Sequence, residues 1–189
     1  MLKSPENLGI IHFIGIGGIG MSGIAEILFQ SGYHVQGSDL KQSNNTNRLE
    51  KLGIKVYIGQ KKSNIIDAKI IVVSTAISEK NEEFIAAKKM FLPIVHRSEM
   101  LGELMRLKQS IAIAGTHGKT TTTSLIAKMI EENGMDPTII NGGIISSLDS
   151  NARLGNGEWI VIEADESDGS FSKLNPTAAI ITNIDLEHL

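Results

Sequence analysis

The sequence predicts an α/β protein with two domains: a Rossmann-like parallel-sheet N-terminal domain, followed by the start of a second α/β domain built on a phosphate loop. Short apolar runs alternate with segments of helical spacing, as in parallel sheets with helices on both faces. Two glycine-rich stretches, at residues 15–20 and 115–121, each follow an apolar run and precede a helical segment. A content of 41% hydrophobic and 21% charged residues is typical of chains with a buried core.

The two domains are expected at residues 1–108 and 109–189. In the first, Asn81 is an expected helix N-cap, followed by Glu82 and Glu83 in the first turn. The expected strands of this domain are 10–14, 33–38, 54–57, 69–73 and 93–95, and the expected helices are 21–30, 46–52, 81–90 and 97–107. In the second domain we expect strands 111–114, 138–140, 158–165 and 178–181, a helix at 124–130, and a glycine turn at 141–143.

Composition and charge exclude several classes of function. The net charge is −3, with both signs mixed along the chain, which argues against a nucleic-acid partner. The chain has no cysteine, so disulfides, thiolate metal sites and thiol nucleophiles are excluded. Residues 8–29 are apolar, but glycines interrupt them and no small-residue cleavage site follows, so we expect no membrane span.

The first glycine-rich stretch, residues 15–20, is named here the glycine turn, and it has the pattern G-x-G-x-x-G. It lies between an expected strand and an expected helix, and Asp39 closes the next strand 19 positions after the last glycine. Taken alone, this context predicts a dinucleotide site, with an acidic residue for the ribose. The alternative is a turn whose glycines serve packing only.

The second glycine-rich stretch, residues 115–121, is named here the phosphate loop. Glycines let the backbone approach phosphate oxygens, and the following helix presents its positive end to the anion. Lys119 is expected to reach the outer phosphates and Thr120 to ligate Mg²⁺. Two residues separate the first glycine from Gly-Lys, whereas a standard Walker A motif has four. The residues expected to bind ATP are Gly115, Thr116, His117, Gly118, Lys119, Thr120 and Thr121.

Carboxylates follow the expected strand at residues 158–165. Glu163 is the best candidate for a metal partner of the phosphate loop, because an acidic residue at the end of a neighbouring strand commonly holds Mg²⁺. Asp165, Glu166 and Asp168 form either part of this site or an exposed acidic loop. His188, taken alone, is a surface or packing residue, and His117 has no carboxylate partner nearby in the sequence and is expected to place the backbone.

Together these motifs resemble the Mur ligases, the ATP-dependent ligases of bacterial cell-wall synthesis. The resemblance covers essentially all 189 residues. The shortened phosphate loop is the form used by this family and by folylpolyglutamate synthetases. The stretches that carry the resemblance are residues 12–22, 37–39, 74–77, 97–101, 115–122, 163–168 and 182–185.

The resemblance implies that the first domain binds a UDP-sugar rather than NAD, and that the second is a P-loop ATP-binding domain with Mg²⁺. By the same resemblance, the catalytic residues are Lys119, Glu163 and His188, and the metal ligands are Thr120, Glu163 and His188. Ser38 and Asp39 are placed near the uridine end, and Thr75 also falls in this site. The implied diphosphate residues are Gly17, Gly18, Ile19, Gly20, Met21 and Ser22.

The activity implied by the resemblance is ATP-dependent ligation in peptidoglycan precursor synthesis, in the cytoplasm. The lactyl carboxylate of UDP-N-acetylmuramate attacks the γ-phosphate of ATP, and L-alanine attacks the resulting acyl phosphate. Mur ligases also have a third domain and a longer central domain. We therefore expect the 189 residues to be a fragment that binds the UDP-sugar but ligates poorly or not at all.

Three alternatives remain at this point. The glycine turn with Asp39 fits an NAD-dependent oxidoreductase, which leaves Lys119 and Glu163 unexplained. A non-catalytic module could bind nucleotide or UDP-sugar without ligation. A sister ligase that reattaches recycled peptides to the same UDP-sugar is not distinguished by the residues present.

Overall fold

The computed structural model describes residues 4–145, 150–164 and 174–185. The chain divides into two compact units, Met1–Met100 and Leu101–Leu189. The division falls within α5 (Arg97–Met105), and the expected domain boundary after Lys108 stays a prediction. Among the described residues, no helix combines the length and apolar character that crossing a membrane requires.

Unit 1 contains a five-stranded sheet in the order β3-β2-β1-β4-β5, in which every neighbouring pair is parallel. This is the Rossmann order 3-2-1-4-5-6 without its sixth strand, so the predicted fold of the first domain is confirmed. The strands are β1 (Ile10–Ile14), β2 (Val35–Asp39), β3 (Lys55–Ile58), β4 (Ala68–Val73) and β5 (Ile94–His96).

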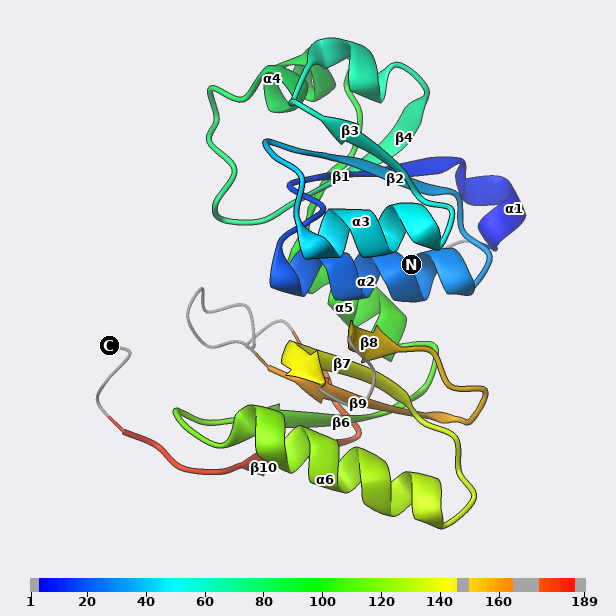
Figure 1. The fold of residues 1–189 in the computed structure, drawn as a ribbon, viewed down its shortest axis with the longest axis vertical. Coiled ribbons are helices and arrows are strands. Elements are labelled where there is room, and N and C mark those ends of the chain that lie inside the picture. Colours follow the sequence, from blue (N-terminus) through cyan, green and yellow to red (C-terminus); the bar gives the residue numbers. More distant parts are fainter. Residues whose placement is uncertain (1–3, 146–149, 165–173, 186–189) are drawn as a thin grey trace. The chain divides into compact units, whose positions relative to one another are not determined.

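Helices cover both faces of this sheet, with α2 and α3 on one face and α4 with the short helix η1 on the other (Figure 1). The helices are α1 (Pro5–Leu8), α2 (Ile19–Gln30), α3 (Asn44–Lys51), η1 (Lys62–Ile65) and α4 (Glu82–Lys89), of which α1 and η1 were not predicted. Asn81 caps α4 as expected, because its side-chain oxygen accepts from the backbone N–H groups of Glu83 and Phe84. On the α4 face, Ile14 packs with Ile65 and other buried apolar residues.

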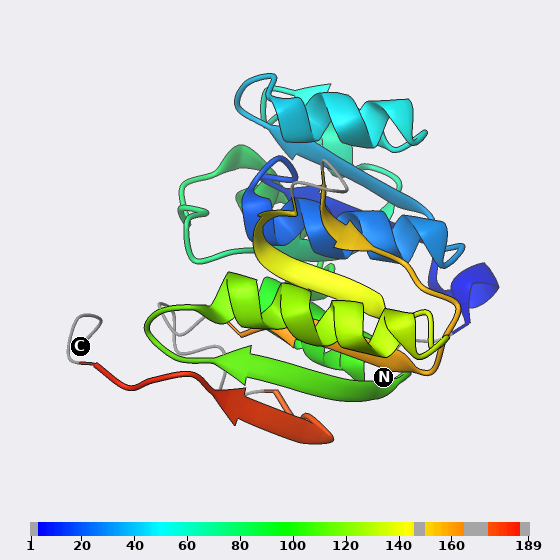
Figure 2. The same ribbon diagram turned by 60° about the horizontal axis from the view of Figure 1, so that its bottom comes forward.

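Unit 2 contains a second sheet in the order β10-β6-β9-β7-β8, covered on one face by α6 (Lys119–Glu132) (Figure 2). The neighbouring strands are parallel except for β7 and β8, which are antiparallel. Ala127 of α6 packs against Ile139 and Val161 in the core. The strands are β6 (Gln109–Ala114), β7 (Thr138–Ile145), β8 (Ser150–Arg153), β9 (Trp159–Glu163) and β10 (Ala178–Ile181).

The predicted glycine turn at residues 141–143 is wrong, because β7 continues through it to Ile145. The added length pairs with β8, an element that was not predicted, and the register shifts between Ile140 and Ile145. Glycines inside a strand commonly mark such an irregularity or a close approach of another group. Here the approaching group is a side chain of the neighbouring strand β9, described below.

In each unit, the glycine-rich stretch follows one strand of a neighbouring pair. The connections that leave the two strands of this pair run toward opposite edges of the sheet. In unit 1 these strands are β1 and β4, and in unit 2 they are β6 and β9. Such switch points open a crevice at the carboxyl ends of parallel strands, where α/β proteins bind ligands. Each unit therefore has its glycine-rich stretch at the expected edge of its own sheet.

Candidate functional site

The phosphate loop joins β6 to α6, and its two glycines are required for different reasons. Gly115 has φ +128°, and a Cβ there would overlap the Thr182 hydroxyl and the backbone of Asn183. Gly118 is the N-cap of α6 with φ +79°, and no described atom lies within 4 Å of a Cβ built on it. The first glycine therefore permits a close backbone contact. The second permits a left-handed turn that leaves open space at the helix start.

Residues after β10 hold the phosphate loop in place. The N–H of His117 donates to Asn183 Oδ1 at 2.9 Å, and the Thr182 hydroxyl donates to the His117 carbonyl at 2.6 Å. The Asp185 N–H donates to the Thr116 hydroxyl at 3.0 Å. His117 is thus held through its backbone, and the expectation that it places the loop rather than acting as a base stays a prediction. The stretch 182–185, singled out only by resemblance, is the scaffold of the loop.

Lys119 and Thr120, the first two residues of α6, lie where the phosphate-binding motif requires them. The Lys119 ammonium donates to the carbonyls of Gly115 at 2.5 Å and Thr116 at 3.1 Å. The Thr120 hydroxyl donates to Glu163 Oε2 at 2.8 Å. The structure therefore brings together the expected lysine, hydroxyl and carboxylate from β9 and α6.

The same oxygens fit a divalent cation of the Mg²⁺ type. A hydroxyl and a carboxylate lie side by side at the carboxyl edge of the sheet. Two such ligands are sufficient, because Mg²⁺ in nucleotide sites usually binds one or two protein oxygens and fills its other positions with water and phosphate oxygens. In the described part of the chain, no group of three or more His, Cys, Asp or Glu side chains converges on one point. Asp165, Glu166, Asp168 and His188 lie outside the described residues, so the metal role expected for His188 stays a prediction.

The sequence did not predict that Gly142 would contact Glu163, nor that Asn141 would be buried against α6. The N–H of Gly142 donates to Glu163 Oε2 at 2.9 Å, and a Cβ on Gly142 would lie 2.7 Å from Oε1. Asn141 is buried, its Nδ2 lies 3.2 Å from the Ser124 hydroxyl, and among the described residues its Oδ1 has no hydrogen-bond partner. The sequence Asn-Gly-Gly after an apolar run was the only feature that could have predicted these contacts, and the same sequence also fits an ordinary turn.

In unit 1, the end of β2 holds the glycine turn. Gly17 donates its N–H to Asp39 Oδ2 at 2.9 Å and accepts from Asn45 Nδ2 at 2.8 Å. Because side chains alternate along a strand, Ser38 and Asp39 face opposite sides of the sheet. The buried Ser38 hydroxyl donates to Glu83 of α4, while Asp39 faces the turn. The site combining Ser38 and Asp39 is therefore divided between two faces.

The other residues expected to hold the UDP-sugar lie at the same edge of the unit 1 sheet. Gly18 and Ile19 are exposed at the start of α2, whereas Met21 and Ser22 are buried. Thr75 is exposed on the loop after β4, and Ile77 of that loop would lie 3.3 Å from a Cβ on Gly15. The structure places these residues at one switch point. Their contact with a ligand stays a prediction.

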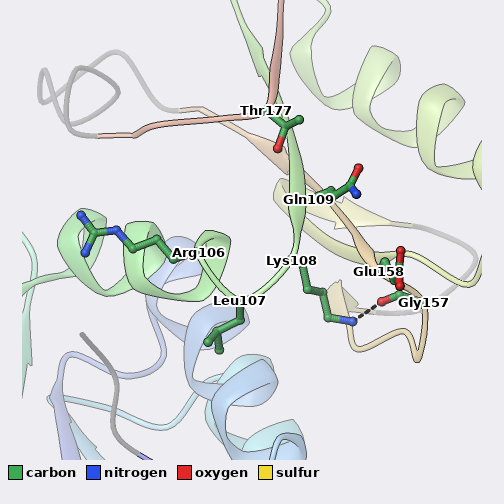
Figure 3. A pocket seen from close by; sticks show the side chains of 7 residues that line it. All are labelled: Arg106, Leu107, Lys108, Gln109, Gly157, Glu158 and Thr177. Carbon is green, nitrogen blue, oxygen red and sulfur yellow. Dashed lines mark hydrogen bonds between the residues drawn. The ribbon is translucent and has the colours of Figure 1, made fainter.

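A cavity of about 530 Å³ lies at the opposite edge of the unit 2 sheet (Figure 3). Its lining residues are Arg106, Leu107, Lys108, Gln109, Gly157, Glu158 and Thr177. The Lys108 ammonium donates to the carbonyls of Gly155 at 2.8 Å and Gly157 at 2.5 Å. Burial lowers the pKa of Lys108, and the charge of Asp136 opposes this shift. Lys108 therefore fastens the loop before β9 to the start of β6, away from the phosphate loop.

Two family descriptions match consecutive parts of the chain. Residues 10–109 match "Mur ligase family, catalytic domain", and residues 113–189 match "Mur ligase middle domain". The first match ends where β6 begins, and the second contains the phosphate loop and Glu163.

Curated proteins and solved structures show the same relationship. The chain is 62% identical over 189 residues to UDP-N-acetylmuramate–L-alanine ligase of Parvibaculum lavamentivorans and 61% identical over 187 residues to that of Dinoroseobacter shibae, covering 38% and 40% of their lengths. Among solved structures, it resembles a UDP-N-acetylmuramate-alanine ligase from Thermotoga maritima, with a TM-score of 0.89, 36% identity, and 96% of this chain and 43% of that chain covered.

A second solved structure carries a different name. It is the UDP-N-acetylmuramate:L-alanyl-gamma-D-glutamyl-meso-diaminopimelate ligase from Neisseria meningitides, with a TM-score of 0.88, 31% identity, and 96% of this chain and 62% of that chain covered. The chain spans about 40% of the length of the curated relatives it matches. Since one family description covers more than half of the 189 residues, the chain belongs to the Mur ligase family.

Proposed function

We propose that this chain provides the UDP-sugar-binding unit and part of the ATP-binding unit of a ligase that joins L-alanine to UDP-N-acetylmuramate. The observation that carries the proposal is the grouping of Lys119, Thr120 and Glu163 around a shortened phosphate loop. The two curated relatives described above carry the name of this activity. We expect the reaction to take place in the cytoplasm, where ATP is available.

In this proposal, residues 115–121 hold the triphosphate of ATP. The backbone around Gly118 and the start of α6 face the phosphates, because the N-terminus of a helix attracts anions. Lys119 leaves the loop carbonyls and moves to the outer phosphates. Thr120 and Glu163 hold Mg²⁺, which neutralises charge on the transferred phosphoryl group.

The chemistry has two steps, and the first needs two negative groups, the carboxylate and the triphosphate, to be brought close together. The lactyl carboxylate oxygen attacks the γ-phosphorus of ATP, and ADP leaves with the bonding electron pair. The neutral amine of L-alanine then attacks the acyl carbon, the bond from that carbon to the phosphate oxygen breaks, and inorganic phosphate leaves with the electron pair and takes up the proton that the nitrogen loses as the amide forms. Lys119 lowers the repulsion between the carboxylate and the phosphates, as charge stabilisation does in other phosphoryl transfers.

The UDP-sugar is assigned to the carboxyl edge of the unit 1 sheet. The glycine turn and the start of α2 receive the diphosphate, and Asp39 and Thr75 lie toward its nucleoside end. The Asp39 carboxylate already accepts from Gly17 N–H, which differs from the ribose contact expected of an NAD site. That contact leaves carboxylate lone pairs for a ribose hydroxyl of either ligand, and it is the family membership that favours a UDP-sugar over the dinucleotide interpretation.

A second candidate is the ligase that attaches a peptide, rather than L-alanine, to the same UDP-sugar. The observation in its favour is the TM-score of 0.88 to the tripeptide ligase from Neisseria meningitides. Against it, the identity to that chain is 31%, whereas the two curated L-alanine ligases are 61–62% identical to this one.

ADP release by the protein expressed from its own gene tests the proposal. We expect release that requires both UDP-N-acetylmuramate and L-alanine, and an alanyl product detectable by mass spectrometry. Release that depends on L-alanyl-γ-D-glutamyl-meso-diaminopimelate instead would identify the second candidate. ADP release independent of the UDP-sugar would contradict both.

A further inference from the structure

Unit 1 buries a cluster of polar side chains that the proposed chemistry does not use. The cluster, named here the buried polar network, joins β1, β2, η1 and α4 on the face of the sheet that α4 covers. Every member is at most 8% exposed, and His12, Ser38 and Glu83 are fully buried. Polar groups buried to this extent are costly unless each finds a hydrogen-bond partner. The members are His12, Gln36, Ser38, Asn64 and Glu83.

Three donors converge on the Glu83 carboxylate. The Ser38 hydroxyl donates to Oε2 at 2.5 Å, and the Asn64 amide donates to Oε1 at 2.6 Å. The His12 ring nitrogen Nε2 lies 3.4 Å from Oε2. Glu83 also belongs to the first turn of α4, where the helix dipole favours negative charge. Glu83 is therefore the acceptor at which the network ends.

The direction of each hydrogen bond follows from the amide groups. Gln36 Nε2 lies 2.8 Å from the Asn64 carbonyl and 3.2 Å from His12 Nδ1, so its two protons go to these acceptors. His12 Nδ1 then accepts, and its Nε2 carries the proton that faces Glu83. Asn64 Nδ2 uses its second proton on the Gly59 carbonyl at 2.9 Å. Every donor is used when Glu83 is an ionised carboxylate.

Ser38 connects this network to the glycine turn. Its carbonyl accepts the N–H groups of Gly15 at 2.8 Å and Ile16 at 2.9 Å. The next residue, Asp39, accepts the N–H of Gly17 at 2.9 Å. Three consecutive amides of the turn are thus held by two consecutive residues of β2. The position of Ser38 sets the position of the turn.

We propose that Glu83 is a positioning residue for the UDP-sugar site: through the Ser38 hydroxyl it fixes the end of β2, which in turn fixes the glycine turn that receives the diphosphate. The inference rests on the proposed function of that turn. It gives Ser38 an indirect role, through its buried hydroxyl and its carbonyl, in place of the direct ligand contact expected from the resemblance.

A Glu83→Gln variant keeps the shape but cannot keep the hydrogen bonds. If the new NH₂ group takes the place of Oε1, it faces the NH₂ group of Asn64, and two donors meet. Rotating the Asn64 amide by half a turn removes this conflict but points the Asn64 oxygen at the Gly59 carbonyl, so two acceptors meet. If the new NH₂ group takes the place of Oε2, it faces the His12 N–H, and two donors meet. This conflict remains even when the Ser38 hydroxyl rotates to accept a proton from the new NH₂ group. Each orientation leaves a buried donor or acceptor unpaired, so the end of β2 loses its fixed position.

The test compares four variants, two single substitutions, their combination and a control, by calorimetric titration with UDP-N-acetylmuramate at a temperature where each is folded. Glu83→Gln and Ser38→Ala are each expected to raise Kd about tenfold, the effect of one lost hydrogen bond. Together they should raise it little more than either alone, because one acts through the other. The control is Ala87→Gly, a fully buried position one helical turn after Glu83, which weakens α4 without removing a side-chain hydrogen bond. It is expected to leave Kd within about twofold.

Amide hydrogen exchange of Gly15, Ile16 and Gly17 provides a readout without ligand. Faster exchange at these amides in Glu83→Gln and Ser38→Ala, but not in Ala87→Gly, supports the positioning role. If Glu83→Gln and Ser38→Ala show the same exchange and the same Kd as Ala87→Gly, the positioning role is overturned and the network is a stabilising element only. If the wild-type protein binds no UDP-sugar, the proposed function fails, and exchange alone decides whether Glu83 holds the turn.

Discussion

The glycine turn of unit 1 and the phosphate loop of unit 2 share the order strand, glycine-rich stretch and helix, but they are held differently. The glycine turn is held by the next strand and helix, through Ser38, Asp39 and Asn45. The phosphate loop is held by Thr182, Asn183 and Asp185, which follow the last described strand. One motif is complete within the consecutive elements β1, α2, β2 and α3, and the other depends on a distant part of the chain.

The two stretches also differ in the chemistry that surrounds them. At the phosphate loop, the Lys119 ammonium bonds to the loop carbonyls and the Thr120 hydroxyl, one residue on, bonds to the Glu163 carboxylate. At the glycine turn, the described contacts bring one acceptor carboxylate, Asp39, and one side-chain amide, Asn45. The first arrangement suits phosphoryl transfer with a metal, and the second suits binding. The comparison therefore predicts that variants of each stretch affect different ligands.

The largest expected effect is that of Lys119→Ala. Removing the ammonium should lower kcat for ADP release by at least about 100-fold, because the charge on the transferred phosphoryl group loses its partner. Titration should show unchanged affinity for UDP-N-acetylmuramate, since Lys119 belongs to the other unit. A normal rate in Lys119→Ala would remove the basis of the phosphate-loop assignment.

Two adjacent glycines give a sharper test of the Glu163 position. A Cβ on Gly142 would lie 2.7 Å from Glu163 Oε1, whereas one on Gly143 would lie 3.6 Å from the nearest atom, Thr120 Cγ2. A flexible carboxylate can move, so Gly142→Ala should keep its melting temperature while kcat/KM falls about tenfold and the Mg²⁺ requirement rises. Gly143→Ala is the matched control and should behave like the wild type. Equal activity in both variants would show that the carboxylate has no fixed role.

A crossed pair of variants tests how the two stretches are held. Thr182→Val removes the hydroxyl bonded to the His117 carbonyl, and Asn45→Ala removes the amide bonded to the Gly17 carbonyl. Each should lower the free energy of unfolding by about 1 kcal/mol. In titrations, Thr182→Val should raise only the Kd for ATP, and Asn45→Ala only the Kd for the UDP-sugar, each by several-fold. If either variant weakens both ligands equally, the separation of roles is wrong.

The smallest expected effect concerns pH. The Asn156 backbone N–H, with further help from Arg153 and Lys108, holds the pKa of Asp136 below its ordinary value of 3.8. A carboxylate with a lowered pKa stabilises the fold above its unfolded pKa, and this contribution is lost as pH falls through the folded pKa. Asp136→Asn should therefore lose stability less steeply than the wild type below about pH 4 in urea unfolding, by a small margin because the group is solvent-screened. If the free energies of unfolding of the two proteins fall in parallel as pH is lowered, protonation of Asp136 is not linked to stability.

Local pattern was sufficient for most of the fold. Alternating apolar runs and helical segments predicted the parallel strands of both units, and Asn81 predicted the start of α4. The contacts of the phosphate loop with Glu163 also followed, because strand ends in a parallel sheet meet at one edge. These predictions depended on residues close in sequence or on a general rule of sheet topology.

Other features could not be predicted because they depend on distant partners. Nothing local distinguishes Glu83 from a surface residue of a helix start, and its burial follows from Ser38 and Asn64, which lie 45 and 19 residues earlier. The Asn141-Gly142-Gly143 sequence has turn chemistry, but pairing with β8 and the approach of Glu163 keep it in a strand. Tertiary contacts decided these positions against local preference.

The attachment of the phosphate loop to residues 182–185 also bears on the order of events during synthesis. The glycine turn can close once Asn45 has been made, 28 residues after Gly17. The phosphate loop must wait for Asp185, 69 residues after Thr116. At 5–20 residues per second, that interval is roughly 3 to 14 seconds on the ribosome. During this time a nascent chain would already hold a closed glycine turn, while its phosphate loop still lacked the segment that shapes it.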